Sequence, residues 1–328
     1  MNRLTALGAT AGAFVAAGVT AKVLDDRRHA SRRRELEESV RFGTVHSPAR
    51  TVVADDGTAI NVEVDEPSRR GAKGPTIVFV HGWVCTLDSW HFQRLALRGR
   101  HRMVLMDHRS HGGSGRSRAD NSSLADLAGD LLRVIEECVP DGPVVLVGHS
   151  MGGMTIMELA GLRPDLFGTK VVGAMLIGTS SGKLIGKAPG IVKLAPLLRA
   201  ASPALDWGRG FNSRSLMKRW AVGPRAADVY VDMSDEMIRR ARTHVLLDFY
   251  PNFVSLDTTK GLADLGRVPT VVVGGTADLL TPFKHSRRLA EAIPGATLVA
   301  VEGAGHMVMF EEHERVTQAL VALLERVG

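Results

Sequence analysis

Short apolar runs alternate with longer amphipathic segments along most of this chain. Six runs have the length and near-uniform apolarity of strands buried on both faces of a sheet, at residues 76–80, 102–106, 144–147, 171–177, 269–273 and 297–301. Most are followed by a segment with helical periodicity, and the last such segment is 312–327. Strands and helices that alternate in this way predict an α/β fold, with a mostly parallel central sheet and helices on both faces.

Two stretches depart from this alternation. Residues 51–54 and 59–64, joined across Asp55-Asp56-Gly57-Thr58, predict an antiparallel hairpin. From about 181 to 263 strand signals are missing and helical patterns dominate, notably at Asp228–Tyr250, so we expect an inserted helical cap over a ligand site. The expected parts are an N-terminal apolar segment (1–24), a charged connector (25–49), an α/β core (50–180 and 264–328) and the cap (181–263).

The strand at 144–147 passes into a helical pattern at Met154–Leu162 with room for only a sharp turn. Gly148 and Gly152 permit Ser150, between them, to take a strained backbone conformation and to project its hydroxyl beyond the sheet. The positive N-terminal end of the following helix points to the place where an oxyanion would develop. This Gly-x-Ser-x-Gly pattern predicts a nucleophile elbow and makes Ser150 the candidate nucleophile.

A second match to the same pattern occurs at Gly178-Thr179-Ser180-Ser181-Gly182, also after an apolar strand. The residues that follow it are broken by Gly and Pro, so no helix can begin at once. We therefore interpret Ser180 as part of a strand end and loop.

Two further candidates follow the last two predicted strands. Asp278 lies after the strand at 269–273, and His306 lies after the strand at 297–301. A serine hydroxyl is a poor nucleophile at neutral pH and needs an adjacent base held in one tautomer. Singly, Asp278 suits a turn or helix cap and His306 suits a structural role. Together, the order Ser150, Asp278, His306 predicts a catalytic triad at the carboxyl ends of the strands.

These motifs resemble the α/β-hydrolase family, in particular serine carboxylesterases and monoacylglycerol lipases. The resemblance covers residues 50–180 and 264–327. The N–H of Met151, which directly follows the nucleophile, is one expected oxyanion-hole donor. The resemblance assigns the second donor to Trp83, which follows the supporting pair His81 and Gly82, and we expect His81 to organise that loop.

Another stretch, Asp107-His108-Arg109-Ser110-His111-Gly112-Gly113-Ser114, resembles a family loop that shapes the floor of the site. The family pattern has glycine where this chain has Ser110. We therefore expect the loop backbone to differ at that residue.

Charge and cysteine content limit the kinds of partner and cofactor that the chain is expected to bind. The net charge is +6, with 9 Lys and Arg against 5 Asp and Glu in residues 1–50, and 13 against 7 in residues 183–261. A basic tail and a basic cap suit an anionic membrane surface, whereas no motif supports a nucleic-acid partner. Cys85 and Cys138 have no metal-ligand spacing. We expect neither a metal nor an organic cofactor.

The segment Leu4–Ala21 has no charged residue and just reaches the length of a membrane span. The basic residues behind it, from Lys22 to Arg34, favour a retained anchor with the catalytic domain on the cytoplasmic side of the membrane. Two alternatives stay open: a signal peptide cleaved near Ala21, which would give a secreted protein, and a loosely attached Ala-rich helix.

We therefore expect a serine hydrolase that cleaves carboxylic esters, lipid-derived or of medium chain length, through an acyl-enzyme. One alternative is a hydrolase of carbon–carbon bonds in ring-cleavage products, which uses the same triad. Another is a non-catalytic binding module on a hydrolase fold.

Overall fold

The computed structural model describes residues 41–68, 74–117, 121–184 and 213–328. The chain divides into two units, residues 1–45 and residues 46–328, and every element named below belongs to the second. The apolar segment 1–24 and the first 16 residues of the expected connector lie outside the described residues, so what was expected of them stays a prediction. Among the described residues, no helix is both long and apolar enough to cross a membrane.

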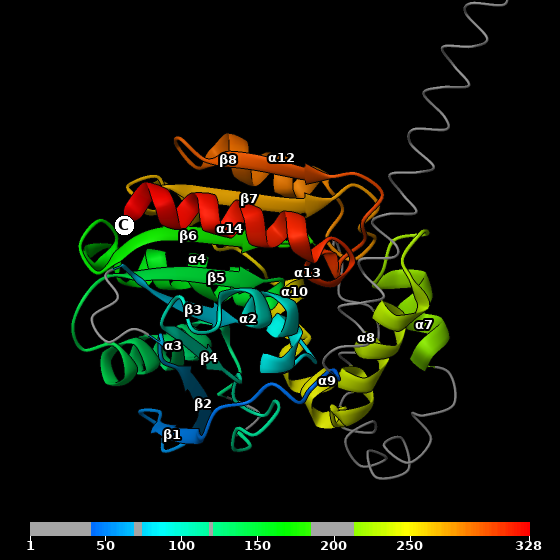
Figure 1. Ribbon diagram of the computed structural model, residues 1–328, viewed down its shortest axis with the longest axis horizontal. Helices are drawn as coiled ribbons and strands as arrows, with labels where there is room; N and C mark the ends of the chain where they lie inside the picture. The colour runs from blue at the N-terminus through cyan, green and yellow to red at the C-terminus, as the bar shows by residue number, and fades with distance from the viewer. Residues whose placement is uncertain (1–40, 69–73, 118–120, 185–212) are drawn as a thin grey trace, which may run out of the picture. The chain divides into compact units, whose positions relative to one another are not determined.

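An eight-stranded sheet forms the centre of the second unit, in the order β1-β2-β4-β3-β5-β6-β7-β8 (Figure 1). Its strands are β1 (Ala49–Val53), β2 (Ala59–Asp65), β3 (Thr76–Val80), β4 (Met103–Met106), β5 (Val144–His149), β6 (Val171–Ile177), β7 (Thr270–Gly275) and β8 (Thr297–Val301). The pairs β1-β2 and β2-β4 are antiparallel, and all other pairs are parallel. The predicted fold class, a mostly parallel sheet in an α/β fold, is confirmed.

Helices cover both faces of this sheet. On one face α3 (Leu124–Cys138), α4 (Met151–Leu162) and α12 (Lys284–Ala292) pack against the strands, and on the other α2 (His91–Leu97) packs against α14 (His313–Val327). Short turns and helices complete the core region: η1 (Leu87–Trp90), η2 (Pro164–Leu166) and α13 (Val308–Glu311). The parallel strands β3 to β7 thus have side chains buried on both faces, as their apolar runs predict. The edge strand β8 departs from this pattern, because only Val301 at its end is buried.

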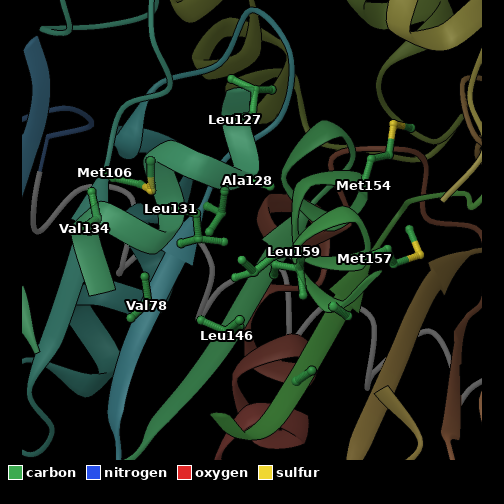
Figure 2. Packing of buried hydrophobic residues seen from close by; sticks show 14 of the residues in the cluster. Val78, Met106, Leu127, Ala128, Leu131, Val134, Leu146, Met154, Met157 and Leu159 are labelled. Carbon is green, nitrogen blue, oxygen red and sulfur yellow. The ribbon is translucent and has the colours of Figure 1, made fainter. Parts of the chain in front are cut away.

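Helix α3 shows how the sequence pattern becomes packing. Its N-terminus is closed by a capping box in which the Ser123 hydroxyl accepts from the Asp126 N–H and the Asp126 carboxylate accepts from the Ser123 N–H. One face of the helix then meets the sheet, where Leu127, Leu131 and Val134 are fully buried (Figure 2). Each buried leucine contributes about 1.5–3 kcal/mol. This packing fixes the helix beside α4, and α4 begins at the expected nucleophile elbow.

In the described part of the chain, six helices are inserted between β6 and β7, and we call them the inserted helices. They are α7 (Ser213–Trp220), α8 (Asp228–Arg240), α9 (Thr243–Phe249), α10 (Pro251–Val254), η4 (Thr259–Gly261) and α11 (Leu262–Leu265). Of these, α7, α8 and α9 lie beyond the carboxyl ends of the parallel strands (Figure 1), whereas η4 and α11 pack against α4. The expected limits of the cap, 181 and 263, stay predictions, because 185–212 are not among the described residues.

The helical pattern expected at Asp228–Tyr250 forms two helices, and they are separated by a short break. Helix α8 ends at Arg240, Ala241 and Arg242 are extended, and α9 begins at Thr243. The break lets the second half change direction, so that Val245 and Phe249 join the buried core beside the sheet. Tertiary packing therefore overrides the local periodicity here.

Candidate active site

The sharp turn between β5 and α4 holds Ser150 in a strained conformation. Strand β5 ends at His149, α4 begins at Met151, and Ser150 between them has a φ of 52°. Non-glycine residues with positive φ are uncommon and cluster at functional sites. Glycine is required on the helix side, because a Cβ on Gly152 would lie 2.1 Å from the Val80 carbonyl oxygen. The chain thus passes close to β3 and leaves the serine at the end of the sheet.

A carboxylate and an imidazole meet beside this turn, as the sequence order predicts. The Nδ1–H of His306 donates to Oδ2 of Asp278 at 2.8 Å. The Thr281 hydroxyl donates to the same oxygen at 2.7 Å, and the backbone N–H groups of Leu280 and Thr281 donate to Oδ1, both at 2.8 Å. The carboxylate is therefore held by four hydrogen bonds and cannot rotate away from the imidazole.

Electrostatics keep Asp278 charged although it is buried. Burial acts to raise the pKa of this carboxyl, but the neighbouring His306 and the hydrogen bonds from His306 and Thr281 outweigh it and hold the pKa below its usual value. Because Nδ1 of His306 is the donor in this pair, the neutral imidazole carries its lone pair on Nε2. A base in the correct tautomer is thereby presented away from Asp278.

Ser150 and His306 line one cavity of about 800 Å³. This volume lies within the range of sites that bind small molecules. No hydrogen bond among the described residues joins the serine hydroxyl to the imidazole, and such bonds are often loose before substrate binds. The cavity walls are largely apolar and include Trp83, Leu216, Met237, Leu246, Phe253 and Met307.

The loop after β3 brings Trp83, the second expected oxyanion-hole donor, to the wall of the cavity. Within the described part of the chain, no hydrogen bond engages the backbone N–H of Trp83 or of Met151. The loop is strained beside Trp83, because Val84, a β-branched residue, has a φ of 55°. The Trp83 ring is anchored from the other side, where Nε1–H donates to the Val245 carbonyl at 3.2 Å. Strain and anchoring together fix the direction of this segment.

His81 forms hydrogen bonds to the backbone of that loop and to the backbone of His108. Its Nδ1–H donates to the Gly82 carbonyl at 2.7 Å, and its Nε2 accepts from the His108 N–H at 2.9 Å. The His108 ring returns a hydrogen bond from Nε2–H to the His81 carbonyl at 3.0 Å. Burial lowers the pKa of His81 to about 4 and that of nearby His111 to about 3, so both rings are neutral near pH 7. No group of described side chains is arranged to hold a metal ion.

The loop Asp107–Ser114, which was expected to shape the floor of the site, has a left-handed backbone at Ser110, where φ is 66°. The Asp107 carboxylate supports this loop by accepting from the N–H groups of Leu87 and Gly113, both at 2.8 Å. The serine that stands in the glycine position therefore still adopts the left-handed conformation that glycine favours.

Ser180, in the second Gly-x-Ser-x-Gly match, is fully engaged elsewhere. It is buried, its hydroxyl bonds to the Gly182 carbonyl at 3.0 Å, and it lies 2.8 Å from Nδ1 of His285. Ser180 does not line the cavity that Ser150 and His306 share. The surroundings of Ser180 match those of a residue that stabilises a loop.

Sequence reasoning missed three residues that the structure places against the site. His149 donates from Nε2 to the His306 carbonyl at 3.0 Å. Thr281 supports Asp278, and Glu311 accepts from the Gly305 N–H. The position of His149 inside the elbow motif was a usable signal, but nothing in the local sequence shows that Glu311 is buried near His306.

The eight-stranded fold, the elbow and the Asp–His pair together define an α/β hydrolase. The sequence profile of the Alpha/beta hydrolase family matches residues 77–319, and the chain belongs to that family. A curated relative, the dihydrolipoyllysine-residue acetyltransferase component of the acetoin cleaving system of Pseudomonas putida, is 26% identical over 270 residues. The match covers 78% of this chain but 65% of that relative, which is less than two thirds of its length.

Solved structures agree on the fold. A thermophilic esterase from Thermogutta terrifontis has a TM-score of 0.70 at 21% identity, and the match covers 86% of this chain and 99% of that chain. The enol-lactonase from Burkholderia xenovorans has a TM-score of 0.69 at 24% identity, over 84% of this chain and 100% of the other. At these identities the likeness concerns the fold.

Proposed function

We propose that this protein is a serine hydrolase of carboxylic esters that works through an acyl-enzyme. Ser150 attacks the ester carbonyl while Nε2 of His306 takes the hydroxyl proton. Asp278 stabilises the resulting imidazolium, and the N–H groups of Trp83 and Met151 donate to the oxyanion. The imidazolium then gives its proton to the departing alcohol. A water molecule, deprotonated by His306, releases the acid and restores Ser150.

The observation that carries this proposal is the 2.8 Å bond between His306 Nδ1 and Asp278, on a cavity that Ser150 shares. It supplies an oriented base beside a strained serine. The backbone N–H groups of Trp83 and Met151 would stabilise the negative charge on the oxyanion. A binding module would need none of these three features together, which favours the enzyme over a non-catalytic role.

The cavity walls support a proposal for the substrate class. Its walls of Leu216, Met237, Leu246 and Phe253 offer an apolar surface to an acyl chain, and a medium-chain or lipid-derived acid matches such walls. A carbon–carbon hydrolase remains the second candidate within the same fold, because the triad chemistry is shared. No described feature of the cavity favours it over ester hydrolysis.

Two measurements test the proposal. A fluorophosphonate probe should label Ser150 covalently in the wild type, and p-nitrophenyl esters with acyl chains of different length should be hydrolysed with a preference for medium chains. Absence of both labelling and ester hydrolysis would contradict the proposal. A ring-cleavage product with a scissile carbon–carbon bond, tested beside the esters, separates the two enzyme classes.

We also propose that the segment Leu4–Ala21 holds the protein at a membrane, with the catalytic unit on the cytoplasmic side. Five arginines and a lysine follow this segment by residue 34, which opposes their transfer across the bilayer. Cell fractionation with mass spectrometry of the mature N-terminus tests this proposal. A soluble extracellular form that begins at Lys22 would support the signal peptide instead.

A further inference from the structure

Glu311 joins two segments that are far apart in the sequence. Glu311 is the last residue of the short helix α13 and is only 4% exposed. Its Oε2 accepts from the Gly223 N–H at 2.8 Å, and Gly223 lies between α7 and α8 of the inserted helices. Both carboxylate oxygens also accept from the Gly305 N–H, at 3.0 and 3.1 Å. Gly305 directly precedes His306.

The two segments joined by Glu311 also touch through their backbones. The Met307 N–H donates to the Ala221 carbonyl at 2.9 Å. A Cβ on Gly223 would lie 2.1 Å from the Gly303 carbonyl oxygen, and a Cβ on Gly305 would lie 2.4 Å from the Gly223 nitrogen. Such close approach leaves no room for side chains, so the path of residues 303–307 depends on the inserted segment beside it.

The Glu311 carboxylate accepts backbone hydrogen bonds, and no described residue serves as its counter-ion. Among the described residues, no Lys, Arg or His forms an ion pair with Glu311. The charged groups that act on it are Asp278, from the loop after β7, and the neighbouring Glu312, and both are acidic. Burial is the main cause that raises the pKa of Glu311, and the two acids add to it. The two backbone hydrogen bonds act to lower the pKa, and the net result is a value of about 7.

We propose that Glu311 is a positioning residue: its carboxylate ties the His306 loop at Gly305 to the inserted segment at Gly223, and so holds the imidazole between Asp278 and Ser150. This inference rests on the proposed serine-hydrolase function. An ionised carboxylate only accepts hydrogen bonds, which suits two converging N–H groups. A protonated carboxyl turns one oxygen into a donor and weakens the tie.

The proposal is tested with the full chain and p-nitrophenyl butyrate, from pH 5.5 to 9, in the wild type, Glu311→Gln and Glu314→Gln. The glutamine keeps the shape of Glu311 but has one acceptor oxygen. A misplaced base should lower kcat by about 10- to 100-fold at pH 8 while KM stays within about threefold. Glu314→Gln removes a nearby charge from α14 without touching Gly223 or Gly305, and should match the wild type.

The pH profile separates positioning from a purely structural role. In the wild type both His306 and Glu311 must lose a proton, so log kcat should fall on the acid side with a slope of about two, against about one in Glu311→Gln. Wild-type kcat and an unchanged acid slope in the folded variant would overturn the inference. If the variant does not fold, a slope of about one in the wild type would also overturn the inference. A wild type that is neither labelled nor active contradicts the proposed function instead.

Discussion

His149 and His306 are linked by a hydrogen bond from the Nε2–H of the first to the backbone carbonyl of the second, at 3.0 Å. The residue before the expected nucleophile thus holds the loop of the expected base. Burial lowers the pKa of His149 to about 3, so the ring stays neutral and keeps one ring proton for this bond at any pH above about 4. The segments that carry Ser150 and His306 are therefore linked by this hydrogen bond, and both also line the same cavity.

The nucleophile assignment is tested by Ser150→Ala. Loss of the hydroxyl should abolish fluorophosphonate labelling and lower kcat by about 10⁴-fold or more, because no other group can form the acyl-enzyme. Ser180→Ala is the matched control, since it alters the other Gly-x-Ser-x-Gly match, and its kcat should change little. If the Ser180 variant loses activity and the Ser150 variant keeps it, the elbow is assigned to the wrong motif.

The acid of the triad is tested by Asp278→Asn. The amide can donate to Nδ1 of His306 and so favours the wrong imidazole tautomer, which should lower kcat by about 10³- to 10⁴-fold without loss of the fold. Circular dichroism checks the fold and steady-state kinetics gives kcat. Asp248→Asn alters another buried acid, on α9, and should keep near-normal turnover. Near-normal turnover in the Asp278 variant would rule out its role.

Buried histidines should make the protein acid-sensitive. The folded pKa values of His81, His111 and His149 are about 4, 3 and 3, below the ordinary 6.5. The unfolded chain therefore binds more protons below pH 6.5, and each histidine lowers the free energy of unfolding by about 1.4 kcal/mol per pH unit as the pH falls toward its folded pKa. Glu311 acts oppositely, since its pKa is raised by folding and it adds stability as the pH falls from about 7 toward 4.5.

The histidine effect is measured by urea unfolding at pH 5, 6 and 7. His111→Phe removes one of these groups while keeping a ring beside Phe249. The variant should take up one proton fewer on unfolding, so its free energy of unfolding should fall less steeply with falling pH than that of the wild type. An identical pH dependence in the two proteins would show that His111 is not held neutral by burial.

The close approach at the elbow is tested by two glycine substitutions. Gly152→Ala places a Cβ 2.1 Å from the Val80 carbonyl oxygen and should lower the free energy of unfolding by about 1–3 kcal/mol or more. Gly129→Ala, within α3, meets nothing within 4 Å and should raise it by about 0.5–1 kcal/mol. Urea midpoints of the two variants should therefore shift in opposite directions, and a neutral Gly152→Ala would argue against the tight turn.

The strands and the order of the site residues could be predicted because both depend on local signals. Apolar runs mark β5, β7 and β8, and the turn or loop that follows each strand carries Ser150, Asp278 or His306. The break at Ala241 could not be predicted, because it depends on where Val245 and Phe249 meet the core. Contacts between distant segments leave no periodic trace in the sequence.

The same limit applies to the residues that support the site. Glu311 resembles any acidic residue near a helix end until Gly223 and Gly305 are seen to converge on it. His81 and His108 are separated by 27 positions, yet each satisfies the backbone of the other. Roles that arise from tertiary contacts of this kind require the structure.

The left-handed backbone at Ser150, the proposed nucleophile, sets stability against activity at a single position. A φ of 52° costs serine of the order of 1–3 kcal/mol, and glycine adopts positive φ without that cost. Replacement of the serine by glycine should therefore make the protein more resistant to heat while it ends turnover. Selection for thermal resistance alone would discard Ser150 early, so directed evolution of this enzyme must screen for catalysis at every round.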